Sequence, residues 1–571
     1  MVKKNKRLEV AFLGGVGEIG KNMTALKYGE DIIIVDCGST FPSLDDTPGI
    51  DLIIPDFAFI KENVEKVKGI LITHGHEDHI GGLPYLLSEC GNIPIYGSSL
   101  AIALIKHKLS EKKIQMPKLH AVKGGEVKNI GNFSVEFINV THSILGAFAL
   151  SITCGGGVIF HTGDYKIDYT PIDGESIDLA RIAAIGNKGV TLMLGESTNV
   201  EKKGTTISER EVGFTLERAI QSNQGKRIII ATFASNVNRV QQIINICERE
   251  GRRVAFDGRS MVKISEIAQE LKMLCCKENT LIDIEDIKSV EPNKLCIIST
   301  GSQGEPMSAL TRMANGEDKE VQIGDNDVVV ISSQPIPGNE KAVYTLINNL
   351  YRRGAKVLYG SLEQLHVSGH ACQDELKLML SLVKPKYFIP VHGEYRHLKK
   401  HEELALTLGI DKDNIKIADI GSRVAITKKS MQFIDSVEAG EVYVDGNSNV
   451  DSFVLKDRKQ LSTDGVVIAL LNINVENRQL ISVDVLTRGI VFDDEFLESI
   501  KILIEDTFAT SSYKNESERG GLKNGIKRKL SRVILNKLKQ KPMILPLLIE
   551  QVKEERNDDD DDSDDTQEGT R

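Results

Sequence analysis

The most chemically suggestive stretch of the chain is a short histidine-rich segment that follows an apolar, strand-like run. Within it, His74, His76, Asp78 and His79 place four metal-binding side chains inside six residues. Imidazole nitrogens and carboxylate oxygens are suitable ligands for Zn²⁺ and Mn²⁺. Two cations held side by side can bind both the attacking and the leaving oxygen of a hydrolytic reaction. The spacing therefore predicts a two-metal site.

Three residues further along the chain have a similar setting, because each stands at the end of an apolar, strand-like run. They are His142, Asp164 and His392. Each of them alone would more often be structural, but together with the first four they complete a set of donors for two metals. Asp36 ends another apolar run and is interpreted as a carboxylate that orients one of the ligands.

The predicted order of strands and helices around these residues differs from one part of the chain to another. Residues 8–165 alternate short apolar strands with turns and some helices, and residues 366–450 return to this mixed style. Between about 207 and 365, strands and helices alternate regularly, as in a parallel sheet with helices on both faces. Residues 451–555 predict a small α+β unit with two helices. The 571 residues, 41% of them hydrophobic, are enough for several such domains.

Composition excludes several classes of protein. No apolar run approaches the roughly 18 residues that cross a bilayer, and the N-terminal segment lacks the apolar stretch of a secretory signal. The eight cysteines are scattered without a C-x-x-C pair, which is typical of buried thiols in a reducing compartment. We therefore predict a cytoplasmic protein with no membrane association.

Charge is distributed unevenly along the chain. The formal net charge is −10, but residues 557–571 hold eight acids and one base, so the polar tail from 556 is predicted to be disordered. Residues 514–541 contain ten Lys and Arg against two Glu. This basic run fits a solvated helix face and a nucleic-acid surface equally well, so the acidic total does not exclude a polyanionic partner.

The order of the candidate ligands resembles that of the metallo-β-lactamase superfamily, including Asp36. Three later segments resemble motifs A, B and C of the β-CASP nucleases: Gly195–Asn199, His366–Ala371 and Pro390–Arg396. Other segments, among them Gly14–Asn22 and Thr300–Pro306, are similar to bacterial ribonuclease J. The resemblance covers about residues 8–550.

This resemblance implies an α/β fold, a metallo-β-lactamase αββα sandwich with an inserted β-CASP domain and a small C-terminal α+β domain. The expected boundaries are 1–206 for the first part of the metallo-β-lactamase domain, 207–365 for the β-CASP domain, 366–450 for the second part with a linker, 451–555 for the C-terminal domain and 556–571 for the tail.

The resemblance also implies two divalent cations, Zn²⁺ or Mn²⁺. His74, His76 and His142 would hold one; Asp78, His79 and His392 would hold the other; and Asp164 would bridge them. It further suggests a Ca²⁺-like structural cation at Gly49, Asp51 and Asp445, although two ordinary Asx turns explain these residues as well.

The expected reaction is phosphodiester hydrolysis, both endonucleolytic and 5′→3′ exonucleolytic on 5′-monophosphorylated single-stranded RNA, in mRNA decay and rRNA maturation. The residues expected to act in catalysis are His370, Glu196, Asp78 and Asp164. Those expected to contact RNA are Phe233, Ser235, Asn236, His366, Val367, Ser368, Gly369 and His370. Asn236 could equally be the N-cap of the following helix.

Two positions depart from the family pattern and keep alternatives open. Leu145-Gly146 stands where Pro-Asp is common, and Glu196 stands where Asp is common. A weakly active paralogue that serves as an RNA-binding or scaffolding subunit is one alternative, and a metallo-hydrolase of thioesters or lactams is another. The resemblance implies a homodimer or homotetramer, or a hetero-oligomer with a ribonuclease J paralogue.

Overall fold

The computed structural model of the chain describes residues 7–42, 47–336, 339–360, 365–427, 429–446, 448–474, 476–511, 513 and 518–551. The segment 556–571, for which we predicted disorder, lies outside the described residues. The chain forms two compact units, residues 1–41 with 51–444 and residues 42–50 with 445–571, and each is described by itself.

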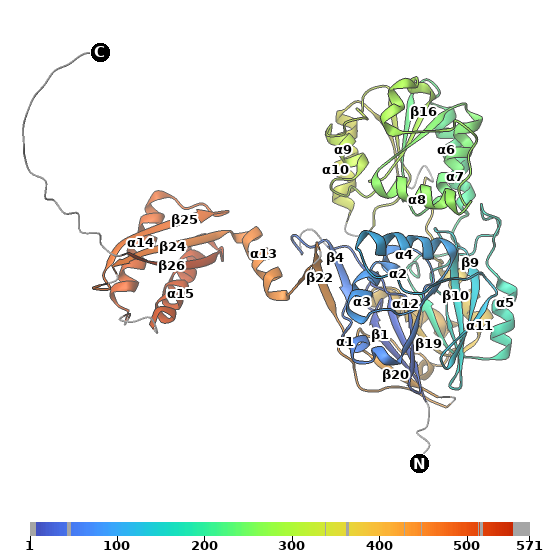
Figure 1. The fold of residues 1–571 in the computed structure, drawn as a ribbon, viewed down its shortest axis with the longest axis horizontal. Coiled ribbons are helices and arrows are strands. Elements are labelled where there is room, and N and C mark those ends of the chain that lie inside the picture. Colours follow the sequence, from blue (N-terminus) through green and yellow to red (C-terminus); the bar gives the residue numbers. More distant parts are fainter. Residues whose placement is uncertain are drawn as a thin grey trace, which may run out of the picture. The chain divides into compact units, whose positions relative to one another are not determined.

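Two mixed sheets form the larger part of the first unit (Figure 1). The first runs in the order β21-β20-β1-β2-β3-β5-β6-β7 and the second in the order β19-β12-β11-β10-β9-β8. The strands of the first are β1 (Leu8–Gly14), β2 (Met23–Tyr28), β3 (Asp31–Val35), β5 (Val67–Leu71), β6 (Ile95–Gly97), β7 (Leu119–Ala121), β20 (Arg423–Ile426) and β21 (Met431–Phe433). Those of the second are β8 (Val127–Ile130), β9 (Phe133–Val140), β10 (Ala147–Cys154), β11 (Gly157–His161), β12 (Val190–Glu196) and β19 (Pro385–Val391).

Side chains alternate between the two faces of these strands, and this builds a four-layered sandwich. On β1, Val10 and Phe12 join the core between the sheets, whereas Ala11 and Leu13 join the core beneath the helices. The helices over the first sheet are α1 (Ala58–Glu62), α2 (Glu77–Ile80), α3 (Leu83–Cys90) and α4 (Ser99–Glu111). Those over the second are α5 (Leu179–Lys188), α11 (Gln373–Val383) and α12 (Tyr395–Thr407). Strand β4 (Leu52–Pro55) pairs antiparallel with β22 (Glu441–Asp445).

A parallel sheet of order β15-β14-β16-β13-β17-β18 completes the first unit. Its strands are β13 (Arg227–Ala231), β14 (Arg253–Asp257), β15 (Leu281–Ile282), β16 (Leu295–Ser299), β17 (Asp327–Ile331) and β18 (Lys356–Leu358). Helices α9 (Ala309–Asn315) and α10 (Glu340–Arg352) pack on one face. On the other face lie α6 (Glu209–Gln221), α7 (Val237–Arg249) and α8 (Arg259–Glu270), as Figure 1 shows. The predicted regular α/β pattern is confirmed.

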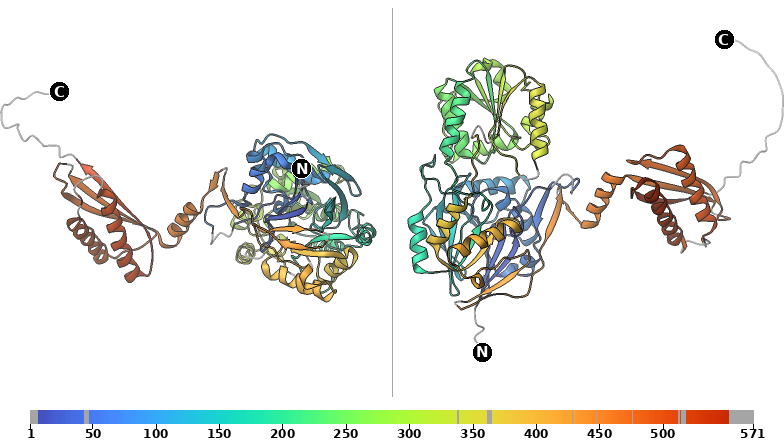
Figure 2. Two further views of the ribbon diagram at one scale, coloured as in Figure 1. Left: turned by 90° about the horizontal axis from the view of Figure 1, so that it is seen from below. Right: turned by 180° about the vertical axis from the view of Figure 1, so that it is seen from behind.

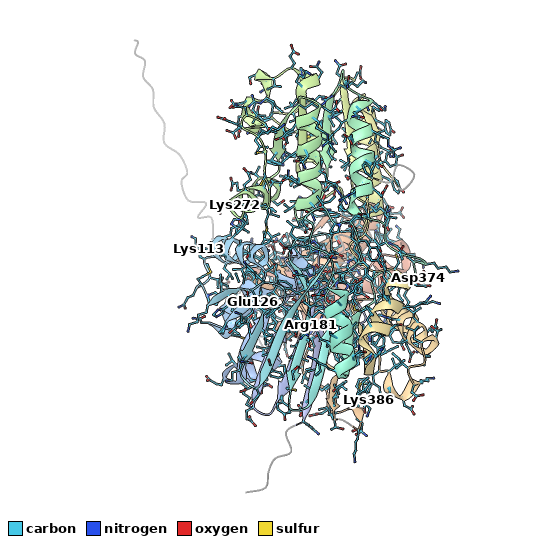
Figure 3. All side chains as sticks on the ribbon, turned by 90° about the vertical axis from the view of Figure 1, so that its right-hand side faces the viewer. Lys113, Glu126, Arg181, Lys272, Asp374 and Lys386 are labelled. Atoms are coloured by element: carbon cyan, nitrogen blue, oxygen red, sulfur yellow. The ribbon has the colours of Figure 1, made fainter. Side chains whose placement is uncertain are left out.

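The parallel sheet is joined to the sandwich by packing as well as by the chain. Helices α4 and α8 contact each other, and Figure 3 shows Lys113 and Lys272, which follow these helices, close together at this junction. The strands of the parallel sheet read as continuous apolar runs because both faces are covered: all five residues of β16 are buried.

The second unit is a small α+β domain, with the sheet order β25-β24-β26. It contains β23 (Ser448–Val450), α13 (Ser452–Asp464), β24 (Val466–Asn474), β25 (Leu480–Arg488), α14 (Asp494–Ala509), α15 (Arg519–Leu538) and β26 (Met543–Gln551). Every second residue of β24 is buried under α14 and α15, which lie on one face of the sheet (Figure 2). The described residues thus hold three helices where we predicted two; α13 has no buried residue, so it lacks the apolar stripe that reveals a helix in a sequence.

In the described part of the chain, no helix is both long and apolar enough to span a membrane.

Candidate metal centre

The predicted ligands gather where strands of both sheets of the sandwich end. Strands β3 and β5 run parallel in one sheet, and β11, β12 and β19 run parallel in the other. His74 follows β5, His142 follows β9, Asp164 follows β11 and His392 follows β19. Parallel strands bring their carboxyl ends to the same edge, so residues far apart in the sequence meet there.

Asp164 lies at the centre of this cluster. Its Oδ2 is 3.2 Å from His79 Nε2, 3.4 Å from His392 Nε2, 3.8 Å from His74 Nε2 and 3.9 Å from His142 Nε2. The ligand atoms form two groups whose members all lie within 4.8 Å of one another: His74, His76 and His142, and Asp78, His79, Asp164 and His392. A third such group contains Asp164, Glu196, His370 and His392.

Hydrogen bonds fix which imidazole nitrogen faces the cluster. The Nδ1 of His79 donates to Asp36 Oδ2 at 2.8 Å, and that of His142 donates to the Gly369 carbonyl oxygen at 2.7 Å. Thr73 Oγ1 donates to Asp36 Oδ2 at 2.8 Å and therefore accepts from His74 Nδ1 at 3.1 Å. In each ring the outer nitrogen is occupied, so Nε2 is left to bind a cation.

The two groups differ in charge. Burial lowers the pKa of His76 to about 4 and holds the pKa values of His74 and His142 well below their usual value. Burial alone would also lower the pKa of His392, but Asp164 and Asp78 raise it to about 9. Asp164, Asp78 and Asp36 likewise overcome burial and raise the pKa of His79 well above its usual value. The first group thus offers neutral nitrogens, while the second holds carboxylates paired with imidazolium.

This donor set fits divalent cations. Neutral imidazoles whose free nitrogens lie close together, with the buried carboxylate of Asp164 and the half-buried one of Asp78 beside them, are the ligand forms that Zn²⁺ and Mn²⁺ bind. His74 Nε2 and His76 Nδ1 are only 3.0 Å apart, and His142 Nε2 is 3.2 Å from the same His76 atom. A cation between them would satisfy all three nitrogens together.

Glu196 and His370 form a pair at the edge of the cluster. His370 Nδ1 donates to Glu196 Oε2 at 2.9 Å, and Glu196 Oε1 accepts from the Tyr165 amide at 3.0 Å. Burial would lower the pKa of His370, but the Glu196 carboxylate raises it. The arrangement holds His370 in a form that can give up a proton.

The predicted RNA-contact residues lie in two loops that approach each other. The rings of Phe233 and His366 are 6.4 Å apart between centroids. Asn236 Oδ1 accepts from the Arg239 amide at 3.0 Å, so Asn236 is the N-cap of α7, as its alternative interpretation required. The side chain of Val367 is buried, which leaves only its backbone for an RNA contact. Ser235 and Ser368 are partly exposed.

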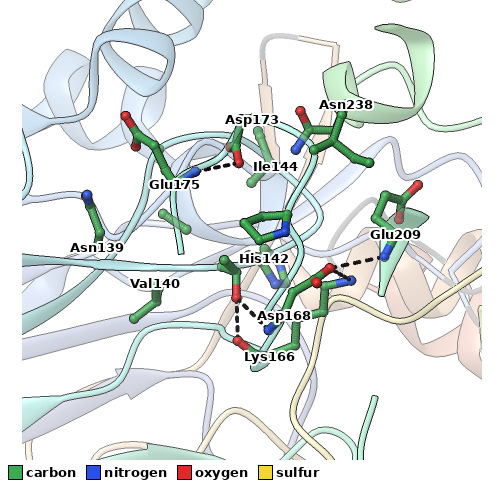
Figure 4. Close-up of a pocket in the computed structure, with 15 residues that line it drawn as sticks. Asn139, Val140, His142, Ile144, Lys166, Asp168, Asp173, Glu175, Glu209 and Asn238 are labelled. Carbon is green, nitrogen blue, oxygen red and sulfur yellow. Dashed lines mark hydrogen bonds and ion pairs between the residues drawn. The ribbon is translucent and has the colours of Figure 1, made fainter. Parts of the chain in front are cut away.

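A small pocket that is open to solvent borders His142 (Figure 4). Its walls include the buried charged residues Lys166, Asp168 and Glu209, and Asp168 Oδ2 accepts from the Glu209 amide at 3.1 Å. Ile144 and Gly146 also line it. Gly146 has φ +71°, a conformation that suits glycine, so the departure from the family pattern at this position shapes the pocket wall.

The oxygens predicted to hold a Ca²⁺-like cation bind an arginine. Arg458 Nη1 donates to the Gly49 carbonyl oxygen at 2.6 Å, and Arg458 Nη2 donates to Asp445 Oδ2 at 2.6 Å. Its guanidinium thus supplies the positive charge that these two oxygens would otherwise take from a cation. Asp51 belongs to the first unit and makes an interaction of its own.

Sequence reasoning missed several residues that hold the site together. Arg239, fully buried, donates to both carboxylate oxygens of Glu209 and to the Ser332 carbonyl oxygen, with His366 Nδ1 at 3.4 Å from its Nη1. Thr198 Oγ1 lies 2.6 Å from His392 Nδ1. Thr198 falls within motif A, which was the one available signal.

Replacing Thr198 by Val is expected to lower metal affinity by about 10- to 100-fold. Thr198 Oγ1 donates to the His392 carbonyl oxygen at 3.1 Å, so it accepts from Nδ1–H and leaves Nε2 free. Valine keeps the shape but loses this acceptor. Isothermal titration of the metal-free chain with Mn²⁺ measures the loss, and Thr198→Ser should retain wild-type affinity. Equal affinity of Thr198→Val and wild type would show that the tautomer is fixed elsewhere.

Segments along the whole chain match known families. They are the metallo-β-lactamase superfamily over residues 16–183, the ribonuclease J β-CASP domain over 225–350, the Zn-dependent metallo-hydrolase RNA specificity domain over 355–415 and the ribonuclease J C-terminal domain over 453–551. The fold and the site thus define a metal-dependent hydrolase of the metallo-β-lactamase superfamily with an inserted β-CASP domain.

Comparison with individual related proteins identifies the family within this superfamily. The chain is 40% identical to Ribonuclease J 1 of Streptococcus pyogenes, over 96% of this chain and 98% of that protein. It is 38% identical to Ribonuclease J of Synechocystis, over 95% and 87%, and 36% identical to Ribonuclease J2 of Bacillus subtilis, over 96% and 100%. The chain belongs to the ribonuclease J family. It is a metal-dependent ribonuclease, as the sequence predicted.

A solved structure shares the fold. A protein of unknown function from Enterococcus faecalis superposes with a TM-score of 0.51 at 17% identity, covering 74% of this chain and all of that one.

Proposed function

We propose that this ribonuclease cuts single-stranded RNA internally and also removes nucleotides in the 5′→3′ direction from 5′-monophosphorylated ends. The observation that carries the proposal is the position of the loop His366–His370. At one end its Gly369 carbonyl oxygen accepts from His142, and at the other His366 lies beside Phe233 of the parallel-sheet domain. A single short loop thus links the donor cluster to a second domain, where an RNA end can be held.

We assign two Zn²⁺ or Mn²⁺ ions to the seven donors. His74, His76 and His142 would hold one cation; Asp78, His79 and His392 would hold the other; and the central position of Asp164 supports a bridging role. Bound there, the cations would activate water and offset charge on the phosphate. His370 would donate a proton to the leaving oxygen and Glu196 would orient its ring.

RNA cleavage tests the direction of attack. Three radiolabelled single-stranded RNAs are incubated with the chain and Mn²⁺: a linear RNA with a 5′-monophosphate, the same RNA with a 5′-triphosphate, and a closed circular RNA. The proposal expects mononucleotides from the monophosphorylated strand, and internal cuts in the circle. Mononucleotides released at the same rate from the triphosphorylated strand would contradict the selectivity for a monophosphate, and an intact circle would contradict the endonuclease activity.

Metal binding should release protons unequally from the two groups. At pH 7.5, His79 and His392 are protonated in the metal-free chain because their pKa values are raised, in the case of His392 to about 9. A cation there displaces these protons, so its affinity should rise with pH up to at least about pH 9, the pKa of His392. The neutral group of His74, His76 and His142 should release almost none. Calorimetry in buffers of different ionisation enthalpy counts the protons, and equal release at both steps would contradict the assigned charge states.

We further propose a homo-oligomer formed through the C-terminal domain. The face of its sheet opposite α14 and α15 exposes Leu486, Leu545, Leu547 and Ile549. Such an apolar face is typical of a subunit interface. Light scattering of wild type and Leu547→Asp should give a larger mass for wild type; equal masses would contradict the proposal.

All eight cysteines are free thiols, which supports a cytoplasmic location.

The gathering of every predicted donor supports an active enzyme over a weakly active paralogue that serves as a subunit. The matched RNA specificity domain disfavours a thioester or lactam substrate.

A further inference from the structure

We propose that the exposed side of α15 in the C-terminal domain is a second RNA-binding surface, which holds the phosphate backbone of the substrate outside the catalytic centre. The inference depends on RNA being the substrate and extends it to a domain that contains none of the candidate catalytic residues. We call this surface the α15 basic surface; it consists of Lys523, Lys527, Arg528, Arg532, Lys539 and Lys541.

The helix is amphipathic in an unusual way. Its buried side, Leu522, Ile526, Leu530 and Ile534, packs against the sheet and α14. The segment from Arg519 to Lys541 contains nine Lys and Arg and no Asp or Glu. A helix face that is merely solvated usually carries both signs of charge, because pairs of opposite charge four residues apart stabilise it. This helix forgoes that stabilisation, and the like charges of Lys523–Lys527 and Arg528–Arg532, each four residues apart, destabilise it slightly.

Among the residues of this domain that the structure describes, few of these charges are neutralised. Lys529 pairs with Asp506 at 3.8 Å, Lys537 pairs with Asp493 at 3.7 Å, and Arg519 donates to the Leu548 carbonyl oxygen at 3.0 Å. The side chains of the six residues of the α15 basic surface pair with no carboxylate among the residues that the structure describes. Lys527, Arg528 and Arg532 are exposed to solvent. Unpaired cations on a rigid element are available for an external anion.

The uncharged positions between the cations are small. Gly521 has open space around its α-carbon, and Asn524, Ser531 and Asn536 are short polar residues on the helix surface. A phosphodiester backbone can therefore approach the helix closely, and Asn524 and Ser531 can donate hydrogen bonds to phosphate oxygens. Because phosphate contacts carry no base information, binding here should be independent of sequence.

The test removes charge from the surface without changing the helix. Lys527→Gln, Arg528→Gln and Arg532→Gln are combined in the full chain, since Gln has nearly the same helix propensity as Lys and Arg. The matched control, Lys456→Gln with Arg488→Gln and Lys501→Gln, removes the same charge from the same domain but not from α15. Circular dichroism melting verifies that both variants fold. If the triple α15 variant does not fold, a double variant with only Lys527→Gln and Arg532→Gln replaces it.

Binding of poly(U) is measured in a chelator, which prevents cleavage, over a series of salt concentrations. Each phosphate contact to a single strand contributes about 0.7 to the slope of log K against log salt, so losing three should reduce the slope by about 2 and weaken binding at moderate salt by roughly tenfold or more. The control should match wild type. Cleavage of a tetranucleotide, which carries too few phosphates to bind both sites at once, should be the same in all three proteins. Failure of wild type to cleave it would count against the ribonuclease mechanism and leave the binding result to stand by itself.

Unchanged poly(U) affinity and salt slope in the α15 variant would overturn the proposal. So would a change in molar mass by light scattering together with unchanged RNA binding, because the surface would then join copies of the chain, its cations facing the acidic residues of α14 such as Asp494 and Glu498.

Discussion

Replacing Asp164 by Asn is expected to lower RNA cleavage by roughly a thousandfold or more and to remove most of the bound metal. A carboxylate that bridges two catalytic cations lowers the activation free energy by several kcal/mol, and each 1.36 kcal/mol changes the rate tenfold. Asp164 Oδ2 lies within 4 Å of Nε2 in four imidazoles, so no other residue can take its place. Asn keeps the size but brings an amide that cannot bridge two cations.

The measurement combines metal content by mass spectrometry with the rate of RNA cleavage. Asp413→Asn is the matched control, because this exposed carboxylate lies in the same unit but in none of the donor groups, and its loss should leave both quantities unchanged. Full metal content in Asp164→Asn, with cleavage reduced less than tenfold, would contradict the central position given to this residue. A metal-depleted but stably folded variant, by contrast, would show that the carboxylate serves the metals rather than the fold.

The cluster of candidate metal ligands could be predicted because its residues stand in short, recognisable sequence patterns. The string from His74 to His79 has four donors within six residues, and His142, Asp164 and His392 each follow an apolar strand. Strand ends are visible as a change from apolar to polar residues, and parallel strands bring such ends to one edge. The place of each residue at the end of an apolar strand was therefore enough to predict that these side chains lie close together.

The supporting residues could not be predicted, because their roles depend on distances that no local pattern encodes. Arg239 would be taken for an ordinary charged residue on a helix, yet it is buried and joins Glu209 to Ser332 across the domain. Gly369 is another such case: a Cβ there would lie 2.6 Å from His142 Cε1, so only glycine allows this loop to meet the metal ligand.

The structural cation stays a prediction, and its residues show what a local pattern leaves open. Gly49 and Asp445 are oxygen donors that suit Ca²⁺, but an oxygen does not specify which positive group it will bind. Arg458, which lies on α13, reaches both of them. Because α13 lacks an apolar stripe, no local pattern predicts a helix, or this arginine, beside them.

Replacing His370 by Gln is expected to lower the turnover number by about 10²- to 10⁴-fold while leaving metal content unchanged, since general acid catalysis contributes about this much. His370 Nδ1 is bonded to Glu196 rather than turned toward a shared cation, and it lies 3.8 Å from Asp164 Oδ2. Loss of one metal ion in this variant would mean that the third donor group, which includes Glu196 and His370, binds a cation itself.

Glu196→Gln separates the charge of the carboxylate from its shape. The carboxylate overcomes burial and raises the pKa of His370, so His370 stays protonated to a higher pH than an ordinary histidine. If protonated His370 is the general acid, the rate falls as pH rises through that pKa. Without the charge the pKa drops, and the fall should begin at a lower pH, with roughly a 10- to 100-fold loss at pH 8 and little loss in acid.

Glu196→Asp keeps the charge but withdraws it by one methylene, about 1.5 Å. Because Glu196 also accepts from the Tyr165 amide, the shorter chain cannot reach both partners from its present backbone position. This variant should therefore lose rate at all pH values while keeping the position of its pH profile closer to wild type than Gln does. Superimposable profiles for Glu196→Gln and wild type would show that His370 gives no proton in the rate-limiting step and that Glu196 only anchors the loop.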